Sequence, residues 1–158
     1  MYLIDGNNVI GQRGKGYESW FSDKSASRRQ LLNDLAKLAR VKKLRLTVVF
    51  DGAPDDSFPE GSSFRGVKVL YARQNSDADT RIVEMTEAER NKKNLTVVTS
   101  DRQLTARVRV CGVRVISSGE FRRMMEDAVE LADNSPTQVA ETEMDDWMRY
   151  FGVDESDD

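Results

Sequence analysis

The feature that most constrains the fold is the regular alternation of short apolar runs with longer amphipathic stretches. The runs are short, rich in β-branched residues and end abruptly at polar residues, which is typical of strands buried on both faces. The stretches between them carry apolar side chains at helical spacing, as in Leu31, Leu32, Leu35 and Leu38. Strands that alternate with helices favour βαβ units and a parallel sheet. We therefore predict an α/β fold of three layers, with helices on both faces of a central, mostly parallel sheet.

The same patterns predict the individual elements and one domain boundary. Strands are expected at residues 2–4, 46–50, 67–71, 95–99 and 113–116, and helices at 24–43, 77–92, 102–110 and 119–131. Residues 5–8 read as a turn and 53–66 as a loop, because glycine, proline, asparagine, serine and aspartate cluster there. After residue 131 the composition becomes acidic and polar, so we expect a domain over 1–131 and a tail over 132–158.

Composition excludes several kinds of chemistry. The chain has 158 residues and no histidine, which removes Ser-His-Asp and Cys-His catalysis and nearly every zinc site with histidine ligands. Its single cysteine, Cys111, cannot form a disulfide framework. No apolar run is long enough to cross a bilayer, and the first residues do not resemble a secretory signal. A cytoplasmic protein without a membrane partner is expected.

The formal net charge of −3 hides a strong asymmetry. Residues 126–158 hold 12 acidic side chains and one basic one, Arg149, whereas residues 1–125 hold 23 basic and 15 acidic ones. A basic body of net charge +8 suggests a polyanionic partner, although a solvated surface can also segregate charge in this way.

Aspartates follow three of the predicted strands. Asp5 comes after Tyr2-Leu3-Ile4, Asp51 after the run 46–50, and Asp101 after the run 95–99 and Ser100. The carboxyl ends of parallel strands meet at one edge of the sheet, where such folds bind ligands. A fourth carboxylate, Asp79, opens the helix that follows the third strand. The sequence thus predicts one crevice that gathers all four.

Carboxylates that crowd together repel one another unless a cation compensates their charge. Oxygen ligands without histidine or cysteine favour Mg²⁺ or Mn²⁺, and such an ion suits phosphodiester hydrolysis. Each aspartate taken singly has a simpler interpretation as a helix cap or a turn residue. Three strands that each end in aspartate favour a functional site over these separate explanations.

Smaller polar side chains accompany the four aspartates. Asn7 and Asn8 follow Asp5-Gly6, where an amide can orient a carboxylate or contact a phosphate, and where turn formation is the simpler alternative. Thr99 and Ser100 can donate hydrogen bonds to a metal-bound water or to Asp101, and Ser100 is otherwise a helix cap. Asp77 competes with Asp79 for the role of ligand and is otherwise a cap.

At this point the sequence resembles a known family, the NYN-domain ribonucleases, and most closely their YacP-like branch within the wider PIN-like nuclease fold. The resemblance covers residues 1–131 and rests on four short blocks in the right order. The blocks are Ile4-Asp5-Gly6-Asn7-Asn8-Val9-Ile10, Val48-Val49-Phe50-Asp51-Gly52, Ser76-Asp77-Ala78-Asp79-Thr80-Arg81-Ile82 and Val98-Thr99-Ser100-Asp101.

The resemblance implies a Rossmann-like sheet and a divalent-metal-dependent, endonucleolytic cleavage of RNA. It implies that Asp5, Asp51, Asp79 and Asp101 form the catalytic and metal-binding centre, with Asn8 in support. RNA is then the expected partner; messenger, transfer, ribosomal and ribosome-bound RNA all remain open. It says nothing of residues 132–158.

Basic side chains near the strand ends fit an RNA path, because lysine and arginine neutralise backbone phosphates. Those that lie in or just after the segments around the strand ends are Arg13, Lys15, Arg73, Arg81, Arg102 and Arg107. Four basic pairs are expected instead to lie exposed at helix ends: Arg28-Arg29, Lys42-Lys43, Lys92-Lys93 and Arg122-Arg123. The aromatic stretch Tyr17, Trp20 and Phe21 either anchors a loop or stacks on unpaired bases.

Residues 144–151 of the tail are too apolar for a plain linker, because they include Trp147, Met148 and Phe151. They suggest a short helix that docks on this body or on a protein partner, whereas their acidic neighbours suggest a shield over the basic surface. Two other enzyme classes fit poorly. A haloacid-dehalogenase-type phosphatase needs an aspartate where Asn7 stands, and no P-loop motif is present. A non-catalytic RNA-binding module of the same fold remains the alternative.

Overall fold

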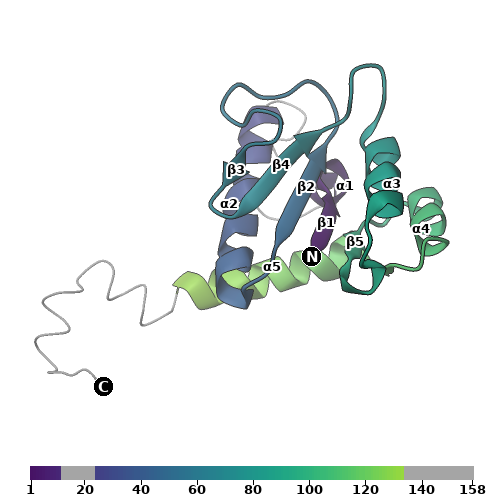
Figure 1. Ribbon diagram of the computed structural model, residues 1–158. Helices are drawn as coiled ribbons and strands as arrows, with labels where there is room; N and C mark the ends of the chain where they lie inside the picture. The colour runs from purple at the N-terminus through teal and green to yellow at the C-terminus, as the bar shows by residue number, and fades with distance from the viewer. Residues whose placement is uncertain (12–23, 134–158) are drawn as a thin grey trace, which may run out of the picture.

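Six strands form one sheet in the order β3-β4-β2-β1-β5-β6 in the computed structural model, which describes residues 1–11 and 24–133 (Figure 1). All neighbouring strands are parallel except the edge pair β3–β4. In chain order the strands are β1 (Tyr2–Asp5), β2 (Leu46–Phe50), β3 (Ser63–Phe64), β4 (Val67–Tyr71), β5 (Thr96–Val98) and β6 (Arg114–Ile116).

The helices cover both faces of the sheet and complete the three layers that the sequence predicts. In chain order they are α1 (Gly6–Gly11), α2 (Lys24–Lys42), α3 (Ala78–Ala88), α4 (Arg102–Arg109) and α5 (Ser118–Asp133), with a 3₁₀ turn, η1, at Lys92–Asn94. Residues of α1, α2 and α5 share one hydrophobic core with β1, β2, β4 and β5, and residues of α3 and α4 share another.

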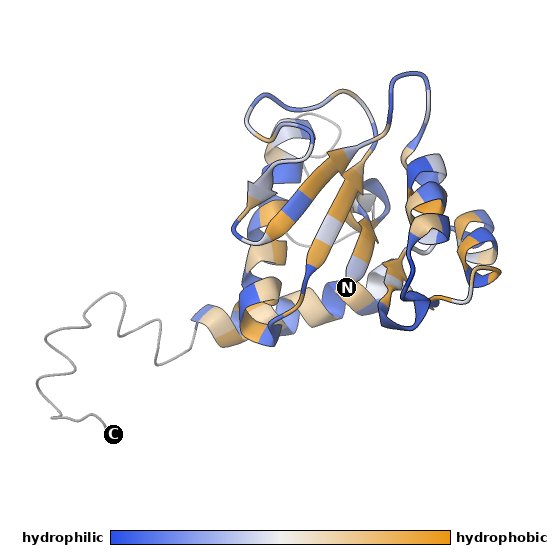
Figure 2. Cartoon of the chain, in the orientation of Figure 1, coloured by the Kyte–Doolittle hydropathy of each residue, from blue (hydrophilic) through white to orange (hydrophobic). Residues whose placement is uncertain are grey.

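The central strands β1, β2 and β5 are largely apolar because they are buried on two faces, whereas the edge strands β3 and β6 are partly exposed (Figure 2). Along β1, Leu3 enters the core beneath α3 and α4, and the next residue, Ile4, enters the core beneath α1, α2 and α5. All five residues of β2 are buried. This double burial explains why the runs lack the alternation of apolar and polar residues that marks a half-exposed strand.

The segment expected as a turn after β1 is the helix α1, which begins directly at Gly6. Gly6 does not have a positive φ. It is needed for close packing, because a Cβ at this position would lie 2.6 Å from the Phe50 ring and 2.9 Å from Val48. The chain therefore enters α1 against β2 at a separation that only glycine allows.

Three other expectations are corrected. The presumed loop 53–66 contains β3, which pairs antiparallel with β4. The helix expected over 77–92 ends at Ala88. Arg28 and Arg122, expected at exposed helix ends, are each only 7% exposed.

Some expectations lie outside the described residues, namely those for residues 12–23 and 134–158. They concern Arg13, Lys15, the aromatic residues Tyr17, Trp20 and Phe21, and the docking helix at 144–151. Within residues 1–11 and 24–133, no helix is both long and apolar enough to cross a membrane.

Candidate active site

Three of the predicted aspartates stand at the carboxyl ends of neighbouring strands. Asp5 is the last residue of β1, Asp51 follows β2 directly, and Asp101 stands three residues after the end of β5. Because β2, β1 and β5 are adjacent and parallel, these ends share one edge of the sheet. The chain runs to one side of β1 through β2 and to the other side through β5, so this edge is the topological switch point.

Asp79 joins them from the first turn of α3. Its pKa is raised, first by desolvation and then by the negative charges of Asp101, Asp77 and Asp51. The charge of Asp79 in turn raises the pKa of Asp5. We call Asp5, Asp51, Asp79 and Asp101 the aspartate cluster, because each acts electrostatically on at least one other member.

Asp5 is the most buried member and is only 4% exposed. Burial raises the pKa of its carboxyl to about 7, and the charges of Asp79 and Asp51 add to this rise. Two hydrogen bonds oppose it: the Thr99 hydroxyl donates to Oδ2 at 3.0 Å, and the backbone N–H of Asn8 also donates to the carboxylate. The largest contributions that raise this pKa are burial and the two neighbouring carboxylates, which is the setting in which a bound cation would favour the ionised form.

The side chain of Asp51 is hydrogen-bonded to the start of α3. Its Oδ1 accepts a hydrogen bond from the backbone N–H of Ala78 at 2.7 Å. Ala78 is the first residue of α3 and precedes Asp79, so this bond brings the end of β2 to the helix that carries the fourth carboxylate. A helix N-terminus also favours the negative charge of Asp51.

Asp77 and Asp101 are helix caps. Asp77 accepts from the backbone N–H of Thr80 at the start of α3, and Asp101 accepts through Oδ1 from that of Leu104 at the start of α4. The cap that the sequence offered as the alternative role of Asp77 is therefore present. Asp101 caps as well, but its Oδ2 accepts no hydrogen bond from the described residues.

The two asparagines of α1 connect the strand ends to one another. Oδ1 of Asn7 accepts from the backbone N–H of Asp51 at 3.0 Å. Oδ1 of Asn8 accepts from the backbone N–H of Ser100 at 2.8 Å and also from the Ser118 hydroxyl. Their side chains thus fix the loops after β2 and β5 against α1.

Of the two hydroxyl side chains beside Asp101, Thr99 bonds members of the aspartate cluster, whereas within the described residues Ser100 does not. The Thr99 hydroxyl donates to Asp5 and accepts from the backbone N–H of Asp101, which links two members of the aspartate cluster. Ser100 instead accepts through Oγ from the backbone N–H of Ser118, at the start of α5. Thr99 is thus the more direct support of the cluster.

The sequence did not identify Arg28 as part of this region. From α2 its Nη2 donates to the carbonyl oxygen of Asp51 at 2.6 Å, and its Nη1 donates to that of Ala53 at 3.1 Å. Its guanidinium also lies 5.3 Å from the ring centroid of Phe50 and 5.1 Å from that of Tyr71. A signal was present, because Arg28 falls on the same helical face as Leu31, Leu32 and Leu35.

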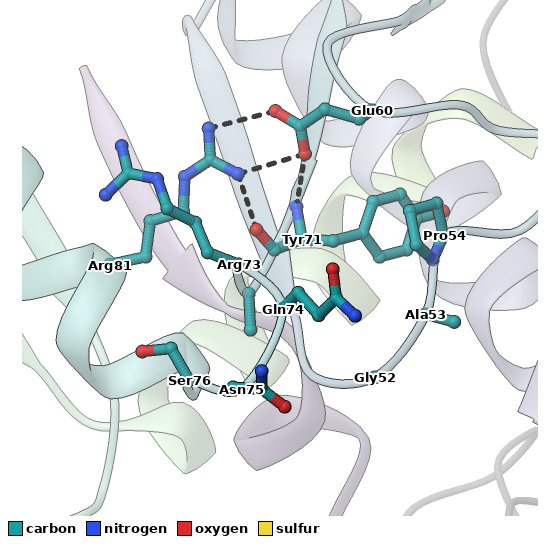
Figure 3. A pocket seen from close by; sticks show the side chains of 11 residues that line it. Gly52, Ala53, Pro54, Glu60, Tyr71, Arg73, Gln74, Asn75, Ser76 and Arg81 are labelled. Atoms are coloured by element: carbon teal, nitrogen blue, oxygen red, sulfur yellow. Dashed lines mark hydrogen bonds and ion pairs between the residues drawn. The ribbon is translucent and has the colours of Figure 1, made fainter.

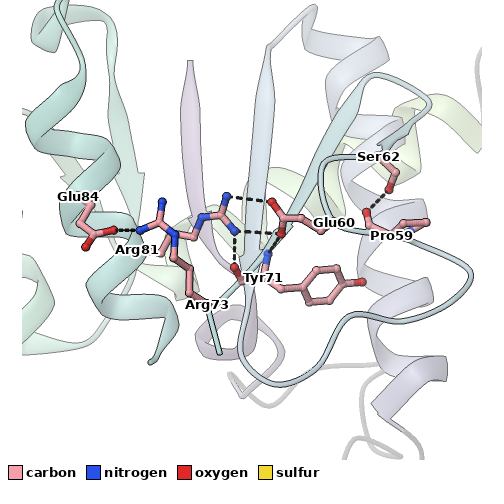
Figure 4. Close-up of polar contacts among 7 residues, drawn as sticks. All are labelled: Pro59, Glu60, Ser62, Tyr71, Arg73, Arg81 and Glu84. Atoms are coloured by element: carbon pink, nitrogen blue, oxygen red, sulfur yellow. Dashed lines mark hydrogen bonds and ion pairs between the residues drawn. The ribbon is translucent and has the colours of Figure 1, made fainter. Parts of the chain in front are cut away.

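Two of the predicted RNA-binding arginines, Arg73 and Arg81, are paired with carboxylates of this chain (Figure 4). Arg81 is used internally, because it pairs with both carboxylate oxygens of Glu60 at 2.9 Å and donates to the carbonyl oxygen of Tyr71. This placement does not support a phosphate contact for Arg81. Arg73 forms an exposed ion pair with Glu84.

The other two arginines lie on α4. Arg102 and Arg107 are exposed on that helix, and Arg107 is close enough to lower the pKa of Asp77 and to oppose the rise at Asp79. Among the predicted basic residues that the structure describes, Arg107 is thus the one with a resolved electrostatic effect on the aspartate cluster.

The donor set of the cluster fits a hydrated magnesium or manganese ion in type. In the described parts of the chain, no three acidic side chains converge closely enough to hold one ion directly. Mg²⁺ does not require this, because it keeps several waters and commonly uses one or two carboxylates. The raised pKa values of Asp5 and Asp79 mean that their ionised forms are disfavoured, and a bound cation would favour those forms.

Solved structures with the same arrangement of elements belong to Rae1 (YacP) of Bacillus subtilis. One, of the W164L mutant, is 22% identical with a TM-score of 0.70 and covers 84% of this chain and 78% of that chain. Another is 21% identical with a TM-score of 0.67 and covers 90% of this chain and 83% of that chain. At this identity the likeness defines the class of fold, a Rossmann-like α/β/α domain.

The family follows from the sequence profile of the YacP-like NYN domain, which matches residues 2–150. The chain belongs to the YacP-like NYN domain family, a nuclease family of the ribonuclease type. The matched range continues past residue 131, where the sequence suggested a boundary. No curated protein matches the chain.

Proposed function

We propose that the chain is a divalent-metal-dependent endoribonuclease that hydrolyses RNA phosphodiester bonds at the aspartate cluster. The observation that carries this proposal is that four carboxylates from four chain segments lie at the switch point of the sheet, close enough for their charges to raise the pKa values of Asp5 and Asp79. Crowded like charges cost stability, and a fold without use for them has no physical reason to gather them. Family membership supports the same reaction class.

Within this proposal the cluster would bind Mg²⁺ or Mn²⁺, which polarises a phosphate and lowers the pKa of a bound water. The chain's own residues hold the ligands in place. Asp51 and Asp101 each use Oδ1 for a backbone N–H, which fixes the direction of the remaining oxygen. The Thr99 hydroxyl fixes Asp5 and the loop of Asp101 together.

Arginines beside the cluster supply the binding of the RNA backbone. Arg107 and Arg102 are exposed on α4, and Arg73 is exposed on the loop after β4. Guanidinium groups on both sides of the carboxylates offset the repulsion between the cluster and the phosphates of the substrate. Arg13 and Lys15 remain proposed contributors on the basis of their charge and sequence position.

A non-catalytic RNA-binding module of the same fold is the second candidate. It is favoured by one observation, that no three acidic side chains of the described residues converge on a single ion position. The capping roles of Asp101 and Asp77 also give these side chains a structural use that needs no metal. The two candidates differ in turnover and in the response to metal.

The experiment that separates them is cleavage of a mixed RNA pool with Mg²⁺, with Mn²⁺ or with EDTA, followed by mapping of the new ends. The proposal predicts internal cuts that need a divalent ion and that disappear in EDTA. RNA binding with no cuts under any metal would favour the non-catalytic module. Cuts that continue unchanged in EDTA would contradict the metal dependence.

A further inference from the structure

A cleft of about 750 Å³ opens beside the aspartate cluster, between the loop after β2 and the loop after β4 (Figure 3). Gly52, Ala53 and Pro54 line one wall, and the segment 71–76 lines the other. We call it the β2–β4 cleft. Its walls run directly into the cluster, because Gly52 follows Asp51, and Ser76 is separated from α3 only by Asp77. The volume is in the range of pockets that enclose small ligands.

The first wall is held in place by Arg28. Its two hydrogen bonds to the carbonyl oxygens of Asp51 and Ala53 span Gly52, whose φ is +89°. A side chain at Gly52 would be strained at this φ, and its Cβ would lie 3.2 Å from Nη2 of Arg28. The wall therefore has a fixed shape before any ligand arrives.

The second wall is held in place by Arg81. This guanidinium bonds Glu60 through two nitrogens and the carbonyl oxygen of Tyr71, and Glu60 also accepts from the backbone N–H of Tyr71 at 2.9 Å (Figure 4). The charge of Glu60 is thus compensated where it borders the cleft. Arg28, behind the first wall, and Arg81, within the second, pre-organise the cleft, and pre-organisation lowers the free-energy cost of binding.

Two arginines line the cleft: Arg81 is ion-paired with Glu60, and Arg73 is one of the phosphate-binding residues of the proposed function. The rest of the lining suits a nucleobase. Gln74 and Asn75 are exposed, and within the described residues neither carboxamide has a hydrogen-bond partner. A carboxamide offers both donors and an acceptor, which match the edge of a base or a ribose hydroxyl. Ala53, Pro54 and Ala72 add apolar surface on which the face of a base can rest.

We propose that the β2–β4 cleft binds the base and ribose of one unpaired nucleotide adjoining the phosphodiester bond cut at the aspartate cluster. This inference rests on the proposed function and names its substrate more narrowly, as single-stranded RNA. A base in a duplex is stacked and paired, so its edge cannot reach Gln74 and Asn75 in the cleft.

The first test measures the binding of nucleoside monophosphates and of ribose 5-phosphate to the whole chain without metal. Binding is monitored by the NMR shifts of the backbone amides. Nucleotides are expected to shift the amides of residues 52–54 and 72–76, and ribose 5-phosphate to bind there at least about fivefold more weakly. Gln74→Ala and Asn75→Gly should each weaken nucleotide binding by about fivefold. Glycine is chosen at Asn75 because its φ is +63°.

Asn91→Ala is the matched control. Asn91 is exposed, makes no side-chain cap hydrogen bond, and precedes β5 at the opposite edge of the sheet. Nucleotide binding by this variant should equal that of the wild type. Shifts confined to α4, or equal binding of ribose 5-phosphate, would overturn the base-binding cleft.

A second test separates the cleft from the nuclease function. Single-stranded RNA that carries one abasic nucleotide at successive positions should be cut more slowly at one position next to the cut site, and Gln74→Ala should remove that dependence. Cleavage that is unaffected by every abasic position would overturn the cleft and leave the nuclease intact. Nucleotide shifts in a chain that cuts no RNA would overturn the nuclease function instead.

Discussion

At the scale of single residues, aspartates of this site cap helices as well as contributing carboxylates to the cluster. Asp5, Asp77 and Asp101 each accept the backbone N–H of the residue three positions later, at the start of α1, α3 and α4. A carboxylate has two oxygens, so one can cap a helix while the other faces the site. Capping and a functional role, which the sequence presents as alternatives, are therefore compatible at Asp101, where only Oδ1 is used for the cap.

Asp77 and Asp79 test this distinction, because they stand two residues apart with different surroundings. Asp79→Asn should abolish cleavage, since it removes a charge from the cluster. Asp77→Asn should keep most activity and cost about 1 kcal/mol of unfolding free energy or less, because asparagine caps nearly as well as aspartate. Single-turnover cleavage and urea unfolding of both variants measure this. The reverse pattern would mean that Asp77 is the functional member of the pair.

The buried carboxyl of Asp5 predicts an unusual pH dependence of stability. Its pKa is about 7 in the folded protein and near 3.8 when unfolded, so the folded state binds the proton more tightly between these values. The free energy of unfolding of the metal-free protein should therefore gain a contribution on the order of a few kcal/mol as pH falls from about 7 to about 4.

The measurement is urea unfolding of the wild type and Asp5→Asn at a series of pH values in EDTA. Subtracting the variant's curve isolates Asp5 from Asp55, Glu60 and Asp77, whose lowered pKa values act in the opposite direction. Mg²⁺ should flatten the difference, because a bound cation favours the ionised carboxylate. A difference curve that is already flat in EDTA would show that Asp5 is ionised at little cost.

At the scale of elements, α1 holds the site together although it is only six residues long. Its asparagines bond the loops after β2 and β5, and its first residue, Gly6, packs against Phe50 and Val48. A displacement of α1 would therefore move several strand ends together.

Gly6→Ala should destabilise the protein by about 1–3 kcal/mol, because its Cβ would overlap the Phe50 ring. It should also slow cleavage, because Asn7 and Asn8 move with the helix. Gly11→Ala is the control at the other end of α1, where a Cβ would meet no described residue within 4 Å. Thermal unfolding and cleavage rates of the two variants decide the point, and equal stability of both would contradict the packing account.

The elements also show what could be predicted from the sequence. The runs that form β2 and β4 were predicted to the residue because every position except Lys68 is apolar or β-branched and the ends are sharp. The helix α1 was missed because Gly6, Asn7 and Asn8 have turn propensity, and so short a helix depends on tertiary contacts. β3 was missed because two residues carry no periodicity.

The site was predictable in part for a related reason. Strand ends fix where Asp5, Asp51 and Asp101 must lie, so sequence order and a parallel sheet sufficed to place them together. The support given by Arg28 and Thr99 depends on side-chain packing between segments far apart in the chain. Arg28 was expected at the surface because arginine is rarely buried without partners.

At the scale of the whole molecule, the charge distribution predicts how the chain binds RNA. Deleting residues 134–158 removes eight acidic side chains and Arg149, and changes the formal net charge from −3 to +4. If this segment shields the basic surface, the truncated protein should bind generic RNA more tightly at low salt, and the gain should shrink as salt rises. If Trp147 and Phe151 dock a protein partner, generic RNA binding should barely change.

Fluorescence anisotropy with a labelled single-stranded RNA over a salt series measures both outcomes. The deletion leaves Asp133 in place, so its ion pair with Lys37 and the end of α5 are retained. Weaker RNA binding by the truncated protein would contradict both interpretations and would make residues 134–158 part of the RNA site.

The measurement that tests the central claim most directly is single-turnover RNA cleavage by the wild type and Asp101→Asn, with RNA affinity determined in parallel. Asparagine keeps the cap on Leu104, so α4 should remain folded. The account predicts wild-type cleavage that requires Mg²⁺ or Mn²⁺, and a fall of about a hundredfold or more in the variant with RNA affinity kept. Undiminished cleavage by Asp101→Asn, or wild-type cleavage that persists in EDTA, would contradict it.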